Sequence, residues 1–305
     1  MRIIRTTALL AALSLTGTRL LGQAAPDAAE LMRRGTALNN AGKLDSAFIV
    51  YQQAMKVAPD NYRVHEGIGS ILDLQGRYAD ARQHIGKALE LAPAESKSGV
   101  MRTMALSYVF EGNASEAASY ERKAYDAQMA AQKPDVAAGI ANELARIYLE
   151  AGDADHALEW YRTGRDAAAK IATLTDTAKT LWDFRWEHAQ ARIAARRGNA
   201  AAAQQHVAAA KALLDKGLIP DQARFFPYLT GYVAFYGGDY RAALAQLEKA
   251  DQNDPFILAL IAQSHEKLGD SAAATSYWRK VLAVNAHSLT TALSRPLASK
   301  RVAGR

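Results

Sequence analysis

The sequence predicts an all-α fold, a solenoid of about seven helical hairpins followed by a C-terminal capping helix. Half of the 305 residues are hydrophobic but only 8% are aromatic, and much of the apolar surplus is alanine, the strongest helix former. A short pattern, a glycine followed five residues later by an alanine, recurs seven times along the chain. Recurrence at intervals of 30 to 50 residues is typical of stacked helical repeats.

Residues 1–24 have the three parts of a secretory signal peptide. The chain opens with the basic stretch MRIIRTT, continues with the apolar run Ala8–Leu15, and reaches small residues that suit cleavage after Ala24. The apolar run is too short to span a bilayer. We therefore expect export to the periplasm or the extracellular space, with no transmembrane anchor after cleavage. An uncleaved anchor or an amphipathic N-terminal helix is the alternative.

Removing the signal also changes the charge of the protein. The formal net charge of the whole chain is +6, and residues 1–24 carry three arginines and no acid, so the mature chain would carry +3. This small excess does not support nucleic-acid binding.

The recurring pattern explains how each hairpin turns. A glycine ends the first helix in the left-handed conformation, and in five copies an Asn or Asp follows as an N-cap for the second helix. The alanine lies one turn further on and lets the two helices approach closely. The seven pairs are Gly42/Ala47, Gly76/Ala81, Gly112/Ala117, Gly152/Ala157, Gly198/Ala203, Gly238/Ala243 and Gly269/Ala274. The five caps are Asn113, Asp153, Asn199, Asp239 and Asp270.

The first two units agree at further positions, 34 residues apart. These positions are Gly35, Gly42, Ala47, Tyr51, Ala54 and Pro59 in the first unit, and Gly69, Gly76, Ala81, Ile85, Ala88 and Pro93 in the second. On these residues the chain resembles the tetratricopeptide repeat family over about residues 28–283. The resemblance implies a right-handed α-solenoid that binds protein partners.

Later units depart from this pattern. Glu121 stands where Tyr51 would align, the fourth and fifth units are lengthened through Gly164–Phe184, and the seventh is three residues short. A long second helix or an inserted turn would absorb the extra residues. We expect the solenoid to occupy residues 25–285 and a cap or tail to occupy residues 286–305, with its helix broken near Pro296.

Catalytic and metal-binding patterns are not visible in the sequence. The chain has no cysteine, which excludes thiolate metal sites and a cysteine nucleophile. His265-Glu266 lacks the second histidine of a zinc-protease motif, and the seven histidines are scattered. We therefore expect no catalytic residue, no metal and no cofactor.

The resemblance implies that the first helices of the repeats line a concave groove where peptides bind. Counting back from each glycine places an arginine-rich stripe beside a tyrosine stripe on this face. The candidates are Arg102, Asn142, Arg146, Arg185, His188, Arg192, Tyr228, Tyr232 and Tyr236. Arginine binds carboxylates through paired hydrogen bonds, and tyrosine supplies rigid contact area. The alternative is that the tyrosines pack between repeats and the arginines are solvated.

Three functions remain open at this point. We favour a non-catalytic exported scaffold that binds a protein or peptide with acidic and aromatic side chains. The family's carboxylate clamp in the first repeats is not expected, because Met32, Thr36, Glu66 and Ser70 occupy the aligned positions. An enzyme or accessory domain of cell-envelope metabolism and an RNA-binding repeat protein are the alternatives.

Overall fold

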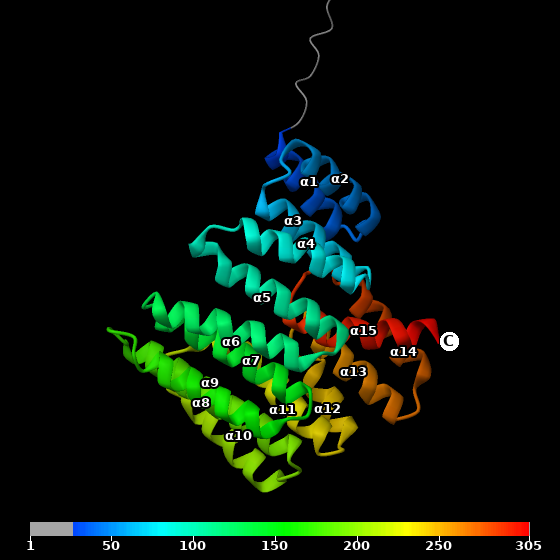
Figure 1. Ribbon diagram of the computed structural model, residues 1–305. Helices are drawn as coiled ribbons and strands as arrows, with labels where there is room; N and C mark the ends of the chain where they lie inside the picture. The colour runs from blue at the N-terminus through cyan, green and yellow to red at the C-terminus, as the bar shows by residue number, and fades with distance from the viewer. Residues whose placement is uncertain (1–26, 305) are drawn as a thin grey trace, which may run out of the picture.

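The computed structural model describes residues 27–304, and the signal peptide expected at residues 1–24 lies outside the described residues. Within this range the chain forms fifteen α-helices and one short 3₁₀ helix, with no strand. Helices pair consecutively, α1 with α2 and so on to α13 with α14, and the seven hairpins stack in chain order (Figure 1). The expected all-α solenoid is confirmed.

The first four hairpins are α1 (Ala28–Asn40) and α2 (Leu44–Val57), α3 (Tyr62–Leu74) and α4 (Tyr78–Leu91), α5 (Ala94–Glu111) and α6 (Ala114–Ala130), and α7 (Pro134–Glu150) and α8 (Ala154–Ala168). The next three are α9 (Asp176–Arg196) and α10 (Ala200–Asp215), α11 (Phe226–Tyr236) and α12 (Tyr240–Leu247), and α13 (Pro255–Lys267) and α14 (Ser271–Ala283). The 3₁₀ helix η1 (Pro220–Phe225) precedes α11, and α15 (Leu289–Ala303) ends the chain.

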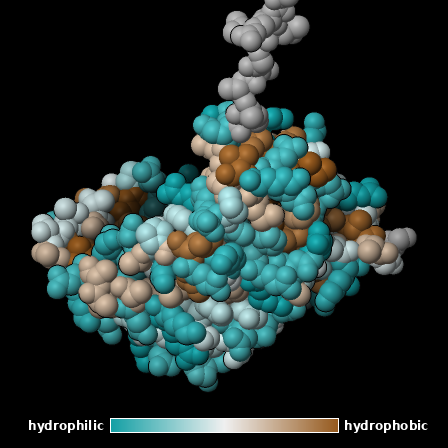
Figure 2. All heavy atoms as spheres, turned by 45° about the horizontal axis from the view of Figure 1, so that its top comes forward, coloured by the Kyte–Doolittle hydropathy of each residue, from teal (hydrophilic) through white to brown (hydrophobic). Residues whose placement is uncertain are grey.

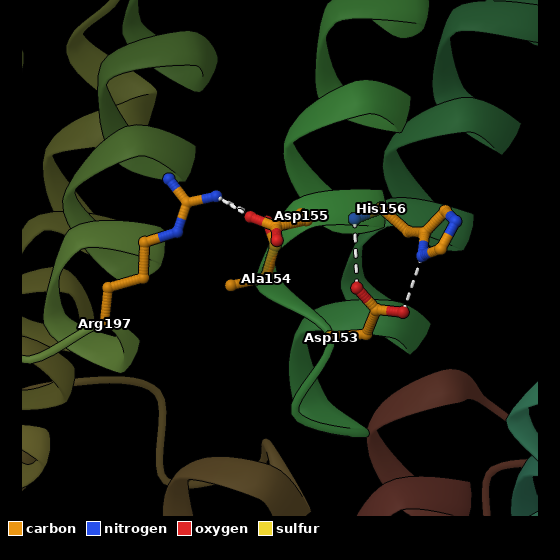
Figure 3. Close-up of polar contacts among 5 residues, drawn as sticks. All are labelled: Asp153, Ala154, Asp155, His156 and Arg197. Atoms are coloured by element: carbon orange, nitrogen blue, oxygen red, sulfur yellow. Dashed lines mark hydrogen bonds and ion pairs between the residues drawn. The ribbon is translucent and has the colours of Figure 1, made fainter.

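The hairpin turns follow the chemistry that the sequence predicts. All seven repeat glycines have a positive φ, between +72° and +94°, a region that residues with a Cβ resist. The side chains of all five predicted N-caps accept a backbone N–H of the first turn of the following helix. Asp153 is drawn in Figure 3, where its carboxylate accepts the backbone N–H of His156 at 3.1 Å and contacts the ring Nδ1 at 2.6 Å.

Alanine allows the two helices of each hairpin to pack closely. All seven alanines of the recurring pattern are completely buried. Gly164 shows how tight the packing is, since a Cβ there would lie 2.8 Å from Asn142 Oδ1. The closeness of the helices therefore depends on side chains that add almost no volume.

Two insertions explain the irregular lengths of the later units. Residues 169–175 form a loop between α8 and α9, and α9 itself is 21 residues long. The extra residues thus enter an inserted turn and a long first helix, not a long second helix. A second insertion contains η1 and brings Arg224 and Phe225 to the start of α11.

The C-terminal helix differs from the expectation, because α15 runs through Pro296 without interruption. Proline removes one N–H from the helix and its ring crowds the preceding turn, but packing holds the helix on both sides of it. Ala292, Ser294 and Ala298 are all at most 1% exposed. The expected break near Pro296 is wrong.

This helix does more than cover the last hairpin. It packs against α13 and α14 and also against α5, so the C-terminal segment, residues 284–304, lies beside the early repeats (Figure 1). His287 Nε2 lies 2.9 Å from Asp73 Oδ2, whose side chain is completely buried. Arg295 donates to the carbonyls of Leu74 at 2.9 Å and Leu282 at 2.8 Å. The solenoid is therefore closed on its inner side by its own C-terminal segment.

One face of the molecule is largely polar. The face shown in Figure 2 is largely hydrophilic, with hydrophobic side chains in small separate groups. None of the helices that the structure describes is both long enough and apolar enough to cross a membrane.

Candidate functional site

The closed solenoid contains a cavity of about 730 Å³ on its inner side. Residues from α7, α9, η1 and α11 line most of it, and the residues before and within the start of α13 and those at the start of α15 complete it. We call it the inner cavity. Six of the nine predicted groove residues line it: Asn142, Arg146, Arg185, His188, Arg192 and Tyr228.

Arg146 lies over the ring of Phe256, with its Cζ 4.9 Å from the ring centroid, and 6.0 Å from the centroid of Tyr228. Its Nε and Nη2 atoms are buried and have no hydrogen-bond partner. Burial opposes its charge, but Tyr228 and nearby carboxylates together leave the pKa of Arg146 raised. The side chain therefore stays charged with unused donors.

Arg192 is buried more deeply than Arg146, with only 7% of the residue exposed. Its Nη2 donates to the Tyr161 hydroxyl at 2.7 Å, and its guanidinium lies 5.9 Å from the Tyr232 ring centroid. Burial again opposes the charge, while the surrounding tyrosines and Glu150 leave the pKa of Arg192 raised. No carboxylate among the described residues forms an ion pair with Arg192.

His188 and Tyr228 stack on each other with ring centroids 5.7 Å apart. Burial, followed by the charges of Arg192 and Arg146, lowers the pKa of His188 well below its usual value. Burial raises the pKa of Tyr228, whose hydroxyl is buried and has no hydrogen-bond partner. At neutral pH both side chains are uncharged, so they do not neutralise the arginines.

Tyr232 and Tyr236 do not line the inner cavity. Tyr232 is completely buried and donates to Glu150 Oε1 at 3.1 Å, and the Tyr236 hydroxyl lies 2.9 Å from Arg196 Nη1. Arg196 also forms an ion pair of 3.0 Å with Glu150. The structure thus places both tyrosines in a network that joins α7, α9 and α11, which corrects their placement on the groove surface.

Arg102 also lies away from the inner cavity. It forms an ion pair of 2.5 Å with Glu143 on α7, beside the buried Glu121 of α6. Burial, then the charge of Glu143, raise the pKa of Glu121 to about 8, although Arg102 opposes the rise. Arg102 therefore serves the packing between α5, α6 and α7.

Several residues of the inner cavity were not expected from the sequence. Arg224 reaches it from η1, and Asp254, Ser288 and Thr290 reach it from the later part of the chain. Counting from repeat glycines cannot find Arg224, because η1 is an insertion outside the repeat. The tail residues reach the cavity only because the solenoid closes.

A second hollow of about 710 Å³ lies between α15 and the ends of α3, α5 and α7. Its buried charged residues already have partners: Asp73 has His287, Glu150 has Arg196, and Arg295 has three backbone carbonyls. The buried charges of this hollow are thus paired, and its exposed Lys300 lies at the surface, whereas Arg146 and Arg192 of the inner cavity form no ion pair with any residue that the structure describes. Residues 27–304 contain no group of three or more side chains suited to hold a metal ion.

Comparison with known proteins agrees with this architecture. The model of the tetratricopeptide repeat family matches residues 62–95, which contain α3 and α4. A tetratricopeptide repeat protein from Parabacteroides merdae ATCC 43184 is 15% identical, with a TM-score of 0.50, and the match covers 90% of this chain and 97% of that one. The apo form of RapI is 10% identical, with a TM-score of 0.58, over 91% of this chain and 99% of that one.

Two further relatives match only part of the chain. The structure of the TPR-like repeats of a kinesin light chain from Podosopora anserina, repeats that are nearly identical to one another, has a TM-score of 0.51. It is 15% identical to this chain, over 61% of this chain and 94% of that one. The protein O-mannosyl-transferase Tmtc3 of Drosophila melanogaster is 28% identical over 122 residues, which are 40% of this chain. The chain spans only 11% of the length of that relative.

The repeats and the hairpin geometry agree with these matches. Residues 62–95 match the tetratricopeptide repeat family, and the described chain has the fold of a tetratricopeptide repeat solenoid.

Proposed function

We propose that the chain is an exported, non-catalytic scaffold that binds a protein or peptide partner at the inner side of its solenoid. One observation carries the proposal: arginines without carboxylate partners line the inner cavity together with aromatic rings. Buried or half-buried positive charges without counter-charges favour an anionic group from another molecule. Aromatic walls favour an apolar or aromatic side chain beside it.

The sequence of residues 1–24 supports export to the periplasm or beyond the cell. A chain without cysteine also has no thiol that could be oxidised in such a compartment. The partner would then be an exported or envelope protein.

The chemistry of the inner cavity favours holding a ligand over transforming it. Arg146 and Arg192 stay protonated, so they can attract an anion but cannot take a proton. His188 is a weak base because its pKa is lowered well below the usual value, and efficient acid–base catalysis needs a pKa near the working pH. Turnover of an envelope substrate by the purified protein would contradict the non-catalytic assignment.

The test is capture of partners from envelope extract with the full chain as bait. The informative variants are Arg185→Ala and Arg224→Ala, because both arginines are exposed, line the inner cavity and form no ion pair among the described residues. Arg162→Ala is the matched control, since Arg162 is exposed on α8 and does not line the cavity. We expect the two cavity variants to lose the partner and the control to retain it.

Equal capture by all four proteins would contradict the proposed function. Tyr232→Ala is unsuitable for this test, although the sequence suggested it. Tyr232 is completely buried and bonded to Glu150, so its loss would disturb the fold itself.

A further inference from the structure

Three atoms of the inner cavity are buried without a hydrogen-bond partner. They are Nε and Nη2 of Arg146 and the hydroxyl of Tyr228. The two side chains adjoin, since the guanidinium of Arg146 lies 6.0 Å from the Tyr228 ring centroid. Folded proteins rarely leave buried donors unused, so their concentration in one cavity points to a ligand that accepts from them.

Arg146 and Arg192 also form no ion pair within residues 27–304, although Glu143, Asp251 and Asp254 line the same cavity. Of the carboxylates that act on Arg146 and Arg192, Glu150 is bonded to Arg196 and Tyr232. Asp254 is the N-cap of α13 and accepts the backbone N–H of Phe256 at 2.8 Å. Arg192 uses Nη2 for the Tyr161 hydroxyl. Two neighbouring guanidinium groups thus face the cavity without an ion pair among the described residues.

We propose that Arg146, Arg192 and the Tyr228 hydroxyl form a binding site for a carboxylate attached to an aromatic or apolar group. This inference rests on the proposed binding function and names the chemical group that is bound. A carboxylate accepts two N–H bonds from one guanidinium, and the Tyr228 hydroxyl donates a third. Phe184, Phe225 and Ile257 line the same cavity and give the apolar group a place to pack.

The position of this carboxylate site separates it from the clamp expected in the first repeats of related proteins. Its residues come from α7, α9 and α11, in the fourth, fifth and sixth hairpins. The inner cavity, of about 730 Å³, is within the usual size of small-molecule sites, roughly 300–1,000 Å³. The carboxylate can therefore belong to a free small acid or to the end of a peptide, and the experiment separates these sources.

The decisive variant is Arg146→Met, which keeps the length and apolar contacts of the side chain but removes its charge. Arg146 has no hydrogen bond or ion pair to lose within the described residues. The variant loses the contacts of the guanidinium with the rings of Phe256 and Tyr228 and also avoids the cost of burying a charge. We therefore expect the midpoint of thermal unfolding to stay within about 4 °C of the wild-type value.

The same variant should lose ligand binding. The probes are phenylacetate, its uncharged analogue phenylacetamide, acetate, inorganic phosphate, and a short peptide ending in phenylalanine with a free or an amidated C-terminus. Calorimetric titration of the full chain should give binding of phenylacetate but not of phenylacetamide. Arg146→Met and Arg192→Gln should weaken it by about thirtyfold or more, while Arg162→Gln should bind as the wild type does.

The titrations with the peptides show which kind of molecule supplies the carboxylate. Tighter binding of the free-ended peptide than of phenylacetate assigns the site to a peptide terminus, and the reverse assigns it to a free acid. The carboxylate site is overturned if no carboxylate binds, if phosphate binds more tightly than every carboxylate, or if Arg146→Met binds as the wild type does. A marked loss of stability in Arg146→Met would also overturn it, because that result assigns the residue to packing.

These outcomes are distinguishable from failure of the proposed function. Partner capture that is lost in Arg185→Ala but unchanged in Arg146→Met, without binding of any small carboxylate, leaves the scaffold standing and overturns the carboxylate site. Binding of phenylacetate without capture of any protein leaves the site standing and overturns the scaffold.

Discussion

Glu121 shows how one residue that departs from the repeat pattern changes the physics of the fold. It occupies a position that is a large apolar residue in the first unit, and it is 1% exposed. One carboxylate oxygen, Oε2, has no hydrogen-bond partner. Burial raises its pKa from 4.5 to about 8, so near neutral pH the folded protein keeps a proton that the unfolded chain releases.

The stability of the protein should therefore fall as the pH rises. A group whose pKa is higher in the folded state contributes its full stability below the unfolded pKa, and that contribution is lost as the pH rises through the folded pKa. Glu121→Gln removes this titration and should stabilise the protein at pH 8.5 by a few kcal/mol, since one pKa unit corresponds to about 1.4 kcal/mol. Urea unfolding at pH 5 and pH 8.5 measures the effect.

Glu159→Gln is the control for this prediction, because Glu159 is exposed on α8. It should change stability little at either pH. An equal gain for Glu121→Gln at both pH values would show that charge is not the cause.

At the scale of the helix, the sequence predicted the turns well because they depend on local chemistry. The glycine that ends the first helix and the Asn or Asp that begins the second act within a few residues of the chain. The lengthening through Gly164–Phe184 was visible in the sequence, but the insertion that contains η1 and the continuity of α15 through Pro296 could not be predicted in the same way. They depend on contacts with other helices, which outweigh local preference.

Two glycines, one inside α5 and one directly after it, separate the effect of backbone conformation from that of packing. A Cβ at Gly99 or at Gly112 would meet no atom within 4 Å, but Gly112 has a φ of +85° whereas Gly99 lies inside the helix. Gly99→Ala should stabilise the protein by about 0.5–1 kcal/mol, and Gly112→Ala should destabilise it by about 1 kcal/mol. Chemical denaturation of both variants tests the difference, and effects of the same sign would contradict it.

At the scale of the whole molecule, the closure of the solenoid decides which predicted residues reach the inner cavity. Counting from the repeat glycines identified the correct helices and most of the cavity arginines. It could not give the winding of the solenoid, which comes from small rotations between repeats. It left open whether the tyrosines pack between repeats, as Tyr232 does, and it could not foresee that His287 meets Asp73 across 214 positions of the chain.

His287 should contribute to stability because it holds the C-terminal segment to the second repeat. His287→Ala leaves Asp73 Oδ2 buried without this partner, while Oδ1 keeps the bond of 2.7 Å from Ser107. We expect a loss of about 1–3 kcal/mol in urea unfolding. His156→Ala, at an exposed histidine, should cost much less, and equal losses would contradict the structural role of His287.

The measurement that tests the closed solenoid most directly is a distance between spin labels on the third repeat and on α15. The chain has no cysteine, so Ser115→Cys and Ser299→Cys, both at exposed positions, can be labelled selectively for double electron–electron resonance. We predict one narrow distribution at short distance, because α15 packs against α5. A broad distribution at long distance would mean that the C-terminal segment leaves the inner side open, and would contradict the account.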